Sequence, residues 1–326
     1  MIHQMAPWVP QFIQSWKNHS QTFTPFSFAT VDPITNRPKC RTVIFRDFLF
    51  HDKRSNVLTF TTDMRGDKVK EILASGSETA PFEACFYFPS TWEQYRFSGK
   101  CFVVSQQQTP PISSKYNLPD AGTIEYPILS PSVHGGAQEL YKYDEGQQQQ
   151  LKGHGEAGDE EEEQEDSEGS AAACQAEGGS VPASGSQPAD LSRSSTSSSR
   201  GGGAPAHPNR VLGSPDYAPP LAKEWQLELT RQWFNLSRST KAQFRKPDPG
   251  TPVTSETSKQ LDKIQRGVDG AKEDAGFDNF GVVCLCIEEV DFLNLKDGRG
   301  GERWKFRRHV DPDTGAESWN EEEVCP

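Results

Sequence analysis

Apolar residues recur every four positions near the start of the chain and then alternate with polar residues in a series of short runs. Trp8, Phe12 and Trp16 fall on one face of a predicted helix, because residues four apart lie on the same side of an α-helix. The runs that follow are rich in β-branched and aromatic residues and are separated by turn residues, which is typical of strands. They occupy residues 26–31, 41–50, 56–62, 83–88 and 94–104.

A short helix is predicted between the third and fourth of these strands. Val69, Ile72 and Leu73 have helical spacing, and Gly76 ends the pattern. This part of the chain therefore predicts several strands and two helices.

A longer amphipathic pattern opens the C-terminal part of the chain at residues 221–244 and predicts one helix. Its apolar face consists of Leu221, Trp225, Leu229, Trp233, Leu236 and Phe244. The sequence PDPG at 247–250 stops this helix, and a polar linker is predicted after it. Residues 280–296 and 303–310 then predict two strands with a turn between them.

Residues 143–209 separate the two parts and are polar, low in complexity and nearly free of aromatic residues. Such a composition cannot offset the entropy of ordering the chain, so we expect a disordered acidic and Ser/Gly-rich insertion. Because strands are predicted on both sides of it, residues 1–142 and 210–326 are expected to complete one domain. No GxGxxG motif or regular strand–helix alternation indicates a dinucleotide-binding parallel sheet. A mainly β fold is favoured, with an antiparallel barrel and a few flanking helices.

Composition and charge agree with this division. Only 33% of the residues are hydrophobic and the mean hydropathy is -0.72, so part of the chain cannot pack into a core. The net charge of -12 arises mostly from nine carboxylates in residues 156–168, a run without any cation. We interpret this run as a solvated insertion rather than a docking site for a basic partner. Neither nucleic acid nor a membrane is expected as a partner.

The cysteines and histidines show no spacing typical of metal ligands, and no metal site is expected. The seven cysteines are Cys40, Cys85, Cys101, Cys174, Cys284, Cys286 and Cys325. Cys284 and Cys286 are two apart in a predicted strand, which favours a pair of buried thiols on one face. The chain shows neither a signal-like start nor the ~18 consecutive apolar residues of a membrane span. We expect an intracellular, cytoplasmic protein.

Candidate chemistry begins in residues 37–48, which place four cations on a strand-like segment. Arg41 and Arg46 project to opposite faces of an extended chain. A solvated edge strand or an anion site could explain them.

Residues at the end of the next strand favour an anion site. Thr61 and Thr62 supply hydroxyls, and Arg65, Gly66 and Lys68 follow where the short helix begins. A lysine in the first turn opposes the helix dipole, and a bound phosphate would reverse that effect. A solvent-facing lysine is the alternative.

Two further segments could contact a ligand. Gln94 and Arg96 share a strand face, and the amide of Gln94 could pair with the edge of a planar heterocycle or face solvent. Arg303, Lys305 and Arg307 form a cationic stripe that is either solvated or directed at an anion.

Taken together, the segments resemble the FMN-binding domain of the pyridoxamine 5'-phosphate oxidase superfamily, and specifically the branch often called the Alr-type family. The resemblance is carried, in order, by NRPKCRTVIFRDF, LTFTTDMRGDKVKEI, CFYFPSTWEQYRFSG, WFNLSRSTKAQFRKPDPG, FGVVCLCIEEVDFLNL, RWKFRR and ESWNEEEVCP. It covers both flanks and breaks at the insertion. It implies a split β-barrel that binds FMN at two equivalent sites in a homodimer.

The resemblance also implies which residues contact FMN. They are Arg41, Thr42, Val43, Ile44, Phe45, Arg46, Thr61, Thr62, Arg65, Lys68, Gln94 and Arg307. Arg41 would contact the phosphate or the ribityl chain, Lys68 the phosphate, and Arg46 and Gln94 the isoalloxazine. Arg307 would reach the cofactor of the other subunit.

The sequence departs from the family pattern where the substrate is held. The RxH motif of the family aligns with residues 303–305, so Arg303 is kept and the histidine is replaced by Lys305. Asp67 and Leu293 also replace an expected basic residue and an expected tryptophan. These changes weaken the case for a vitamin B6 phosphate as substrate.

Three functions remain open at this stage. The first is an FMN-dependent oxidoreductase without an assigned substrate or catalytic residue, since electron transfer to a flavin requires orientation more than a protein acid. The second is a flavin-binding carrier or sensor without turnover. The third is an interaction protein that binds no flavin.

Overall fold

The computed structural model describes residues 5–19, 21–75, 79–108, 126, 128–134, 219–267, 270, 272, 274–296, 300–310 and 317–326. The predicted disordered insertion lies outside these residues. The strands are β1 (Thr24–Asp32), β2 (Arg37–Phe48), β3 (Val57–Asp63), β4 (Ala80–Phe88), β5 (Glu93–Ser105), β6 (Phe280–Asn294), β7 (Glu302–Val310) and β8 (Glu317–Val324). The helices are α1 (Trp8–Lys17), α2 (Asp67–Leu73), α5 (Ala222–Phe234), α6 (Arg238–Ala242) and α7 (Ser255–Gln265). Short 3-10 turns are η1 (Leu49–His51), η2 (Lys53–Ser55), η3 (Pro131–His134), η4 (Gln243–Arg245) and η5 (Phe277–Asn279).

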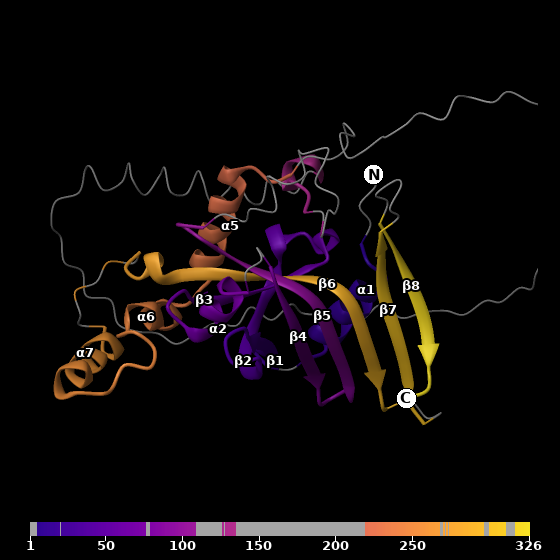
Figure 1. Ribbon diagram of the computed structural model, residues 1–326, viewed down its shortest axis with the longest axis horizontal. Helices are drawn as coiled ribbons and strands as arrows, with labels where there is room; N and C mark the ends of the chain where they lie inside the picture. The colour runs from indigo at the N-terminus through magenta and orange to yellow at the C-terminus, as the bar shows by residue number, and fades with distance from the viewer. Residues whose placement is uncertain are drawn as a thin grey trace, which may run out of the picture.

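Six antiparallel strands close into a barrel (Figure 1). Their order is β3-β2-β1-β4-β5-β6, and a second pairing of β6 with β3 closes the ring. This confirms the predicted mainly β fold with flanking helices. β7 and β8 extend the sheet beyond one half of β6. Strands from both flanks of the chain therefore lie in one sheet, while the division into domains stays a prediction.

Two apolar clusters pack on opposite faces of β6. Val283 and Leu285 belong to the cluster that contains Phe12 of α1. Cys284 and Cys286 belong to the other, which α5 covers. Both thiols are buried, as predicted, and burial raises their pKa values well above the ordinary value.

The predicted helix over 221–244 is divided into α5, α6 and η4. α5 ends at Phe234, and the hydroxyl of Ser237 accepts a hydrogen bond from the Thr240 backbone N–H, which caps the start of α6. Leu221 precedes α5 and is exposed, whereas the other residues of the predicted apolar face are buried. Spacing alone did not reveal the break because the apolar positions continue through it.

The prediction of a polar linker after residue 250 was wrong, since this stretch contains α7. Thr254 and Thr257 form reciprocal hydrogen bonds that cap this helix, and only Ile264 on it is buried. No apolar stripe was present to predict it. β8 was not predicted as a strand because its sequence, ESWNEEEV, is acidic and mostly exposed. No helix of the described ranges has the length and apolar character needed to cross a bilayer.

Candidate functional site

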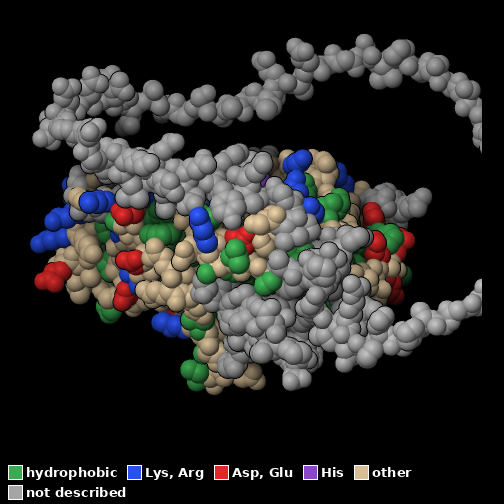
Figure 2. Space-filling view, turned by 90° about the horizontal axis from the view of Figure 1, so that it is seen from above, with side chains coloured by type: hydrophobic (Ala, Val, Ile, Leu, Met, Phe, Trp, Pro, Cys, Tyr) green, Lys and Arg blue, Asp and Glu red, His purple; other side chains and the backbone are tan. Residues whose placement is uncertain are grey.

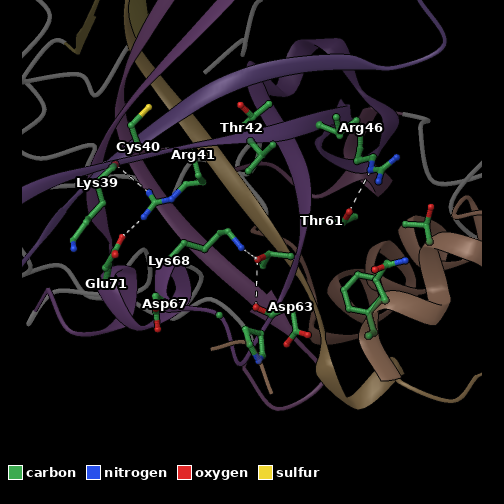
Figure 3. Close-up of a pocket in the computed structure, with 18 residues that line it drawn as sticks. Lys39, Cys40, Arg41, Thr42, Arg46, Thr61, Asp63, Asp67, Lys68 and Glu71 are labelled. Carbon is green, nitrogen blue, oxygen red and sulfur yellow. Dashed lines mark hydrogen bonds and ion pairs between the residues drawn. The ribbon is translucent and has the colours of Figure 1, made fainter. Parts of the chain in front are cut away.

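A cavity of about 670 Å³ lies among β2, β3, α2 and the segment from α6 to Pro249 (Figure 3). Its volume falls within the ~300–1,000 Å³ that is usual for small-molecule sites. Eight of the predicted site residues line it: Arg41, Thr42, Val43, Ile44, Arg46, Thr61, Thr62 and Lys68.

The cavity forms where two barrel strands separate. β2 pairs with β1 from Arg37 to Phe45, but the ladder between β2 and β3 contains no pair before Phe45 and Phe60. The β3-facing edge of residues 42–44 is therefore directed toward the cavity that these residues line. Backbone N–H and C=O groups on such an edge suit a planar ligand with donors and acceptors on its rim. A register shift follows between Phe45 and Asp47.

Arg41 is held at one end of the cavity by polar groups of the protein. Its Nη1 donates to the Thr30 hydroxyl at 2.6 Å, and its Nη2 donates to Glu71 Oε2 at 2.6 Å. The Thr30 hydroxyl also donates to Glu71 Oε2 at 2.5 Å. Glu71 of α2 is buried with only 9% of its surface exposed. The Arg41 guanidinium is thus fixed in place, and Glu71 offsets part of its charge.

Lys68 lies beside Arg41 and extends across the cavity (Figure 3). Its Nζ donates to the Thr62 hydroxyl at 3.1 Å, and within the described ranges it forms no ion pair with a carboxylate. Burial, followed by the charge of Arg41, lowers the pKa of Lys68. A nearby anion would offset both effects.

Arg46 occupies the other end, where its Nε donates to the Thr61 hydroxyl at 3.2 Å. Burial lowers the pKa of this guanidinium, and no carboxylate of the described part of the chain pairs with it. Half-buried cations without a carboxylate partner are costly unless a ligand supplies the negative charge. Arg46 and Lys68 therefore place, at each end of the cavity, a cation without a carboxylate partner among the described residues.

The remaining predicted site residues lie outside this cavity. Phe45 is buried in the barrel core. Arg65 binds Asp63 and Asp248 through its guanidinium, with nitrogen–oxygen distances of 2.7 and 2.9 Å. Gln94 lies on β5, between β4 and β6.

Arg307 of β7 also lies outside the cavity of its own subunit. Its side chain is 54% exposed, and its Nε lies 3.3 Å from Glu289 Oε1. A contact between Arg307 and a ligand in this cavity would require a second subunit.

Sequence reasoning missed one wall of the cavity and one internal counter-charge. Thr240, Gln243, Phe244 and Pro249 form the wall, and they lie far along the chain from β2. The helical pattern marked Phe244 as a core residue, but no local signal connects this segment with β2. Glu71 sits two residues from Val69 on a short helix, and its burial depends on Arg41 and Thr30 from other strands.

The described residues contain no group of three or more His, Cys, Asp or Glu side chains that could hold a metal ion.

Comparison with known proteins gives a consistent family. The model "Pyridoxamine 5'-phosphate oxidase, FMN-binding domain" matches residues 5–105. The uncharacterized protein YGR017W of Saccharomyces cerevisiae is 45% identical over 346 aligned residues, which cover 100% of both chains. Pyridoxine/pyridoxamine 5'-phosphate oxidase 2 of Arabidopsis thaliana is 32% identical over 103 residues, which cover 31% of this chain and 48% of that protein.

A solved structure shows the same fold. The pyridoxamine 5'-phosphate oxidase-related, FMN-binding protein of Nostoc punctiforme PCC 73102 aligns over 100% of both chains with a TM-score of 0.53 and 19% identity. The chain belongs to one family with YGR017W over its full length, and its residues 5–105 form a pyridoxamine 5'-phosphate oxidase-like FMN-binding domain. The matched region ends with β5, so β6 and the α6–η4 wall, which complete the barrel and the cavity, lie beyond it.

Proposed function

We propose that the protein is an FMN-dependent oxidoreductase of the Alr-type branch of the pyridoxamine 5'-phosphate oxidase superfamily. The observation that carries the proposal is the cavity at the separation of β2 and β3, with Lys68 and Arg46 at its two ends and no carboxylate partner for either among the described residues. FMN combines a phosphate dianion with a planar ring that has donors and acceptors on its rim. The family match points to the same cofactor.

The donors of the cavity fit the two parts of FMN. Lys68, Thr62 and Arg41 would hold the phosphate, because charge-assisted hydrogen bonds to an anion are the strongest that these side chains form. Arg46 and the strand edge at residues 42–44 would face the ring. When bound, FMN supplies two-electron redox chemistry. The cavity would orient the cofactor, and the charge of Arg46 beside the ring would favour electron uptake.

The proposed functional unit is a homodimer. Gln94 and Arg307 lie outside the cavity of their own subunit, whereas the family resemblance implies that Arg307 reaches the cofactor of the other subunit. Size-exclusion chromatography with light scattering tests the dimer. A monomer at micromolar concentration that binds FMN fully would contradict it.

A carrier or sensor function without turnover is the second candidate, and the position of Arg303 favours it. Arg303 aligns with the arginine that grips the substrate in the family, but here its Nε and Nη2 donate to Asp291 at 2.8 and 2.7 Å. A bidentate pair of this kind occupies the guanidinium. Lys305 replaces the histidine of the same motif.

Spectroscopy of the purified protein separates these functions. A flavin spectrum that survives dialysis is expected. Bleaching by NADPH or pyridoxamine 5'-phosphate without oxygen would support the oxidoreductase. A flavin that neither reductant bleaches would favour the carrier or sensor. A colourless protein that takes up no added FMN would contradict both.

A further inference from the structure

A second cavity lies on the other side of the α6–η4 wall, between this segment and the end of α7. Its volume is about 690 Å³, similar to that of the first cavity. Gln243 lines both cavities, so one layer of chain separates them. The proposed function assigns nothing to this second cavity.

Its lining is cationic. Arg238, Arg245, Lys246 and Arg266 line the cavity, and no Asp or Glu is among the lining residues. Figure 2 shows Lys and Arg side chains interspersed with Asp and Glu side chains at the end of the molecule where α6 and α7 lie in Figure 1, so the cationic character belongs to the cavity lining rather than to the whole surface there. Four cations converging from two segments raise the local positive potential and favour an anion.

Three of these cations, Arg238, Lys246 and Arg266, have no carboxylate partner among the described residues. The Nε of Arg266 donates to the Asp262 backbone carbonyl at 3.2 Å, which orients the guanidinium and leaves its other donors for a ligand. The polar side chains of Ser239 and Gln265 also line the cavity.

The cavity has an apolar part as well. Ile264 is buried, with 4% of its surface exposed, and lines the cavity together with Ala242. A hydrated inorganic ion needs no such surface, whereas an organic phosphate carries apolar groups that would contact it. Guanidinium groups also match phosphate oxygens in pairs.

We infer that this second cavity is a binding site for a phosphorylated small molecule, separate from the proposed FMN site. This inference does not depend on whether the protein has the proposed oxidoreductase activity. Because the two cavities share Gln243, a ligand in the second cavity contacts the wall of the first.

Calorimetric titration of the full-length protein with inorganic pyrophosphate tests the inference, with one equivalent of FMN per subunit present to fill the first cavity. We expect saturable binding of one pyrophosphate per subunit. Lys246→Gln/Arg266→Gln should weaken it by ~10-fold or more, the effect of losing at least one charge-assisted hydrogen bond. Lys259→Gln/Lys263→Gln is the matched control, because it removes two charges from exposed positions on α7 outside the cavity. This control should bind like the wild type.

Four results would overturn the inference. The first is no pyrophosphate binding, and the second is an equal loss in both double variants, which indicates unspecific attraction. The third is citrate binding as tightly as pyrophosphate, which would contradict the phosphate class. Lys68→Gln separates this proposal from the FMN proposal. The fourth result is that Lys68→Gln alone abolishes pyrophosphate binding, in which case the anion occupies the first cavity and the second-site inference fails.

Discussion

Arg41 Nη2 lies 2.6 Å from Glu71 Oε2 at the wall of the first cavity. The carboxylate comes from α2 and the guanidinium from β2, so the contact joins the helix to the barrel. Arg41 and Lys68 therefore differ in their partners. Glu71 offsets the charge of Arg41, whereas Lys68 lacks a carboxylate partner in the described ranges. Arg41 is held in position by the protein, and Lys68 contributes a charge that a ligand can neutralise.

Replacing Lys68 should therefore weaken FMN binding, because it removes a charge that the phosphate of FMN would neutralise. We expect Lys68→Ala to reduce the binding free energy by ~1.5–3 kcal/mol, the range for a hydrogen bond to a charged group. Fluorescence quenching on FMN titration measures the change. Riboflavin, which lacks the phosphate, is the control ligand and should lose little. Equal losses for FMN and riboflavin would place Lys68 elsewhere along the cofactor.

Replacing Arg41 should affect both cofactor binding and folding. Arg41→Ala should weaken FMN binding by ~1.5–3 kcal/mol and also destabilise the protein, because it leaves the buried Glu71 carboxylate without its cation. Adding Glu71→Gln to this variant should restore much of the stability in urea unfolding but not the FMN affinity. If the double variant recovers neither stability nor FMN affinity, or recovers both, the two roles of Arg41 are not separable.

The low pKa of Lys68 predicts a pH dependence of FMN binding. Burial and the Arg41 charge lower this pKa below 10.5 in the folded protein. Between the folded and unfolded pKa values the unfolded state binds more protons, so the stability of the ligand-free protein rises with pH through this window. The phosphate prefers the charged amine, so FMN affinity should fall as the pH rises through the folded pKa.

Lys68→Arg is the control for this pH dependence, since arginine keeps its charge throughout the range. Titration of the flavin ring is common to both proteins and does not affect the comparison. The FMN dissociation constant of the wild type should rise at alkaline pH, and that of Lys68→Arg should rise less over the same pH range. An equal loss of FMN affinity with rising pH in both proteins would exclude Lys68 as the titrating group.

A buried ion network on α5 should dominate local stability. Arg231 is 4% exposed, its Nε and Nη2 donate to Glu228 at 2.8 and 2.7 Å, and its Nη1 donates to Asp47 at 2.7 Å. Arg231→Ala leaves the buried Glu228 without its cation and removes one partner of Asp47, which keeps His51, so it should cost about 3–5 kcal/mol in urea unfolding. Arg231→Lys keeps the charge but loses the bidentate geometry, so an intermediate loss is expected. Unchanged stability of Arg231→Ala would contradict the role of the network.

Deleting residues 146–208 should leave folding and flavin content intact. Their composition offers little apolar surface for a core, and changing the length of a flexible connection alters the closure entropy only slowly. Circular dichroism and the ratio of flavin to protein absorbance measure the outcome. A deletion variant that folds but loses flavin would assign the segment a role at the cofactor site.

Much of the barrel and half of the site could be predicted from the sequence. The alternation of apolar residues located most strands, and Arg41, Thr62 and Lys68 line one cavity as the motifs implied. The wall containing Gln243 could not be predicted, because its position depends on long-range packing rather than on a local pattern. α7 was not predicted because a helix with one buried side chain, Ile264, has no apolar stripe.

The pairing of β6 with both β3 and β5 has a consequence for how the protein could be produced. The strands that close the barrel come from two stretches of chain on either side of residues 143–209. Cleavage within that stretch would leave two polypeptides joined by interstrand hydrogen bonds and by both apolar clusters. Two separately expressed fragments should therefore reassociate, and recovery of flavin binding would report their complementation.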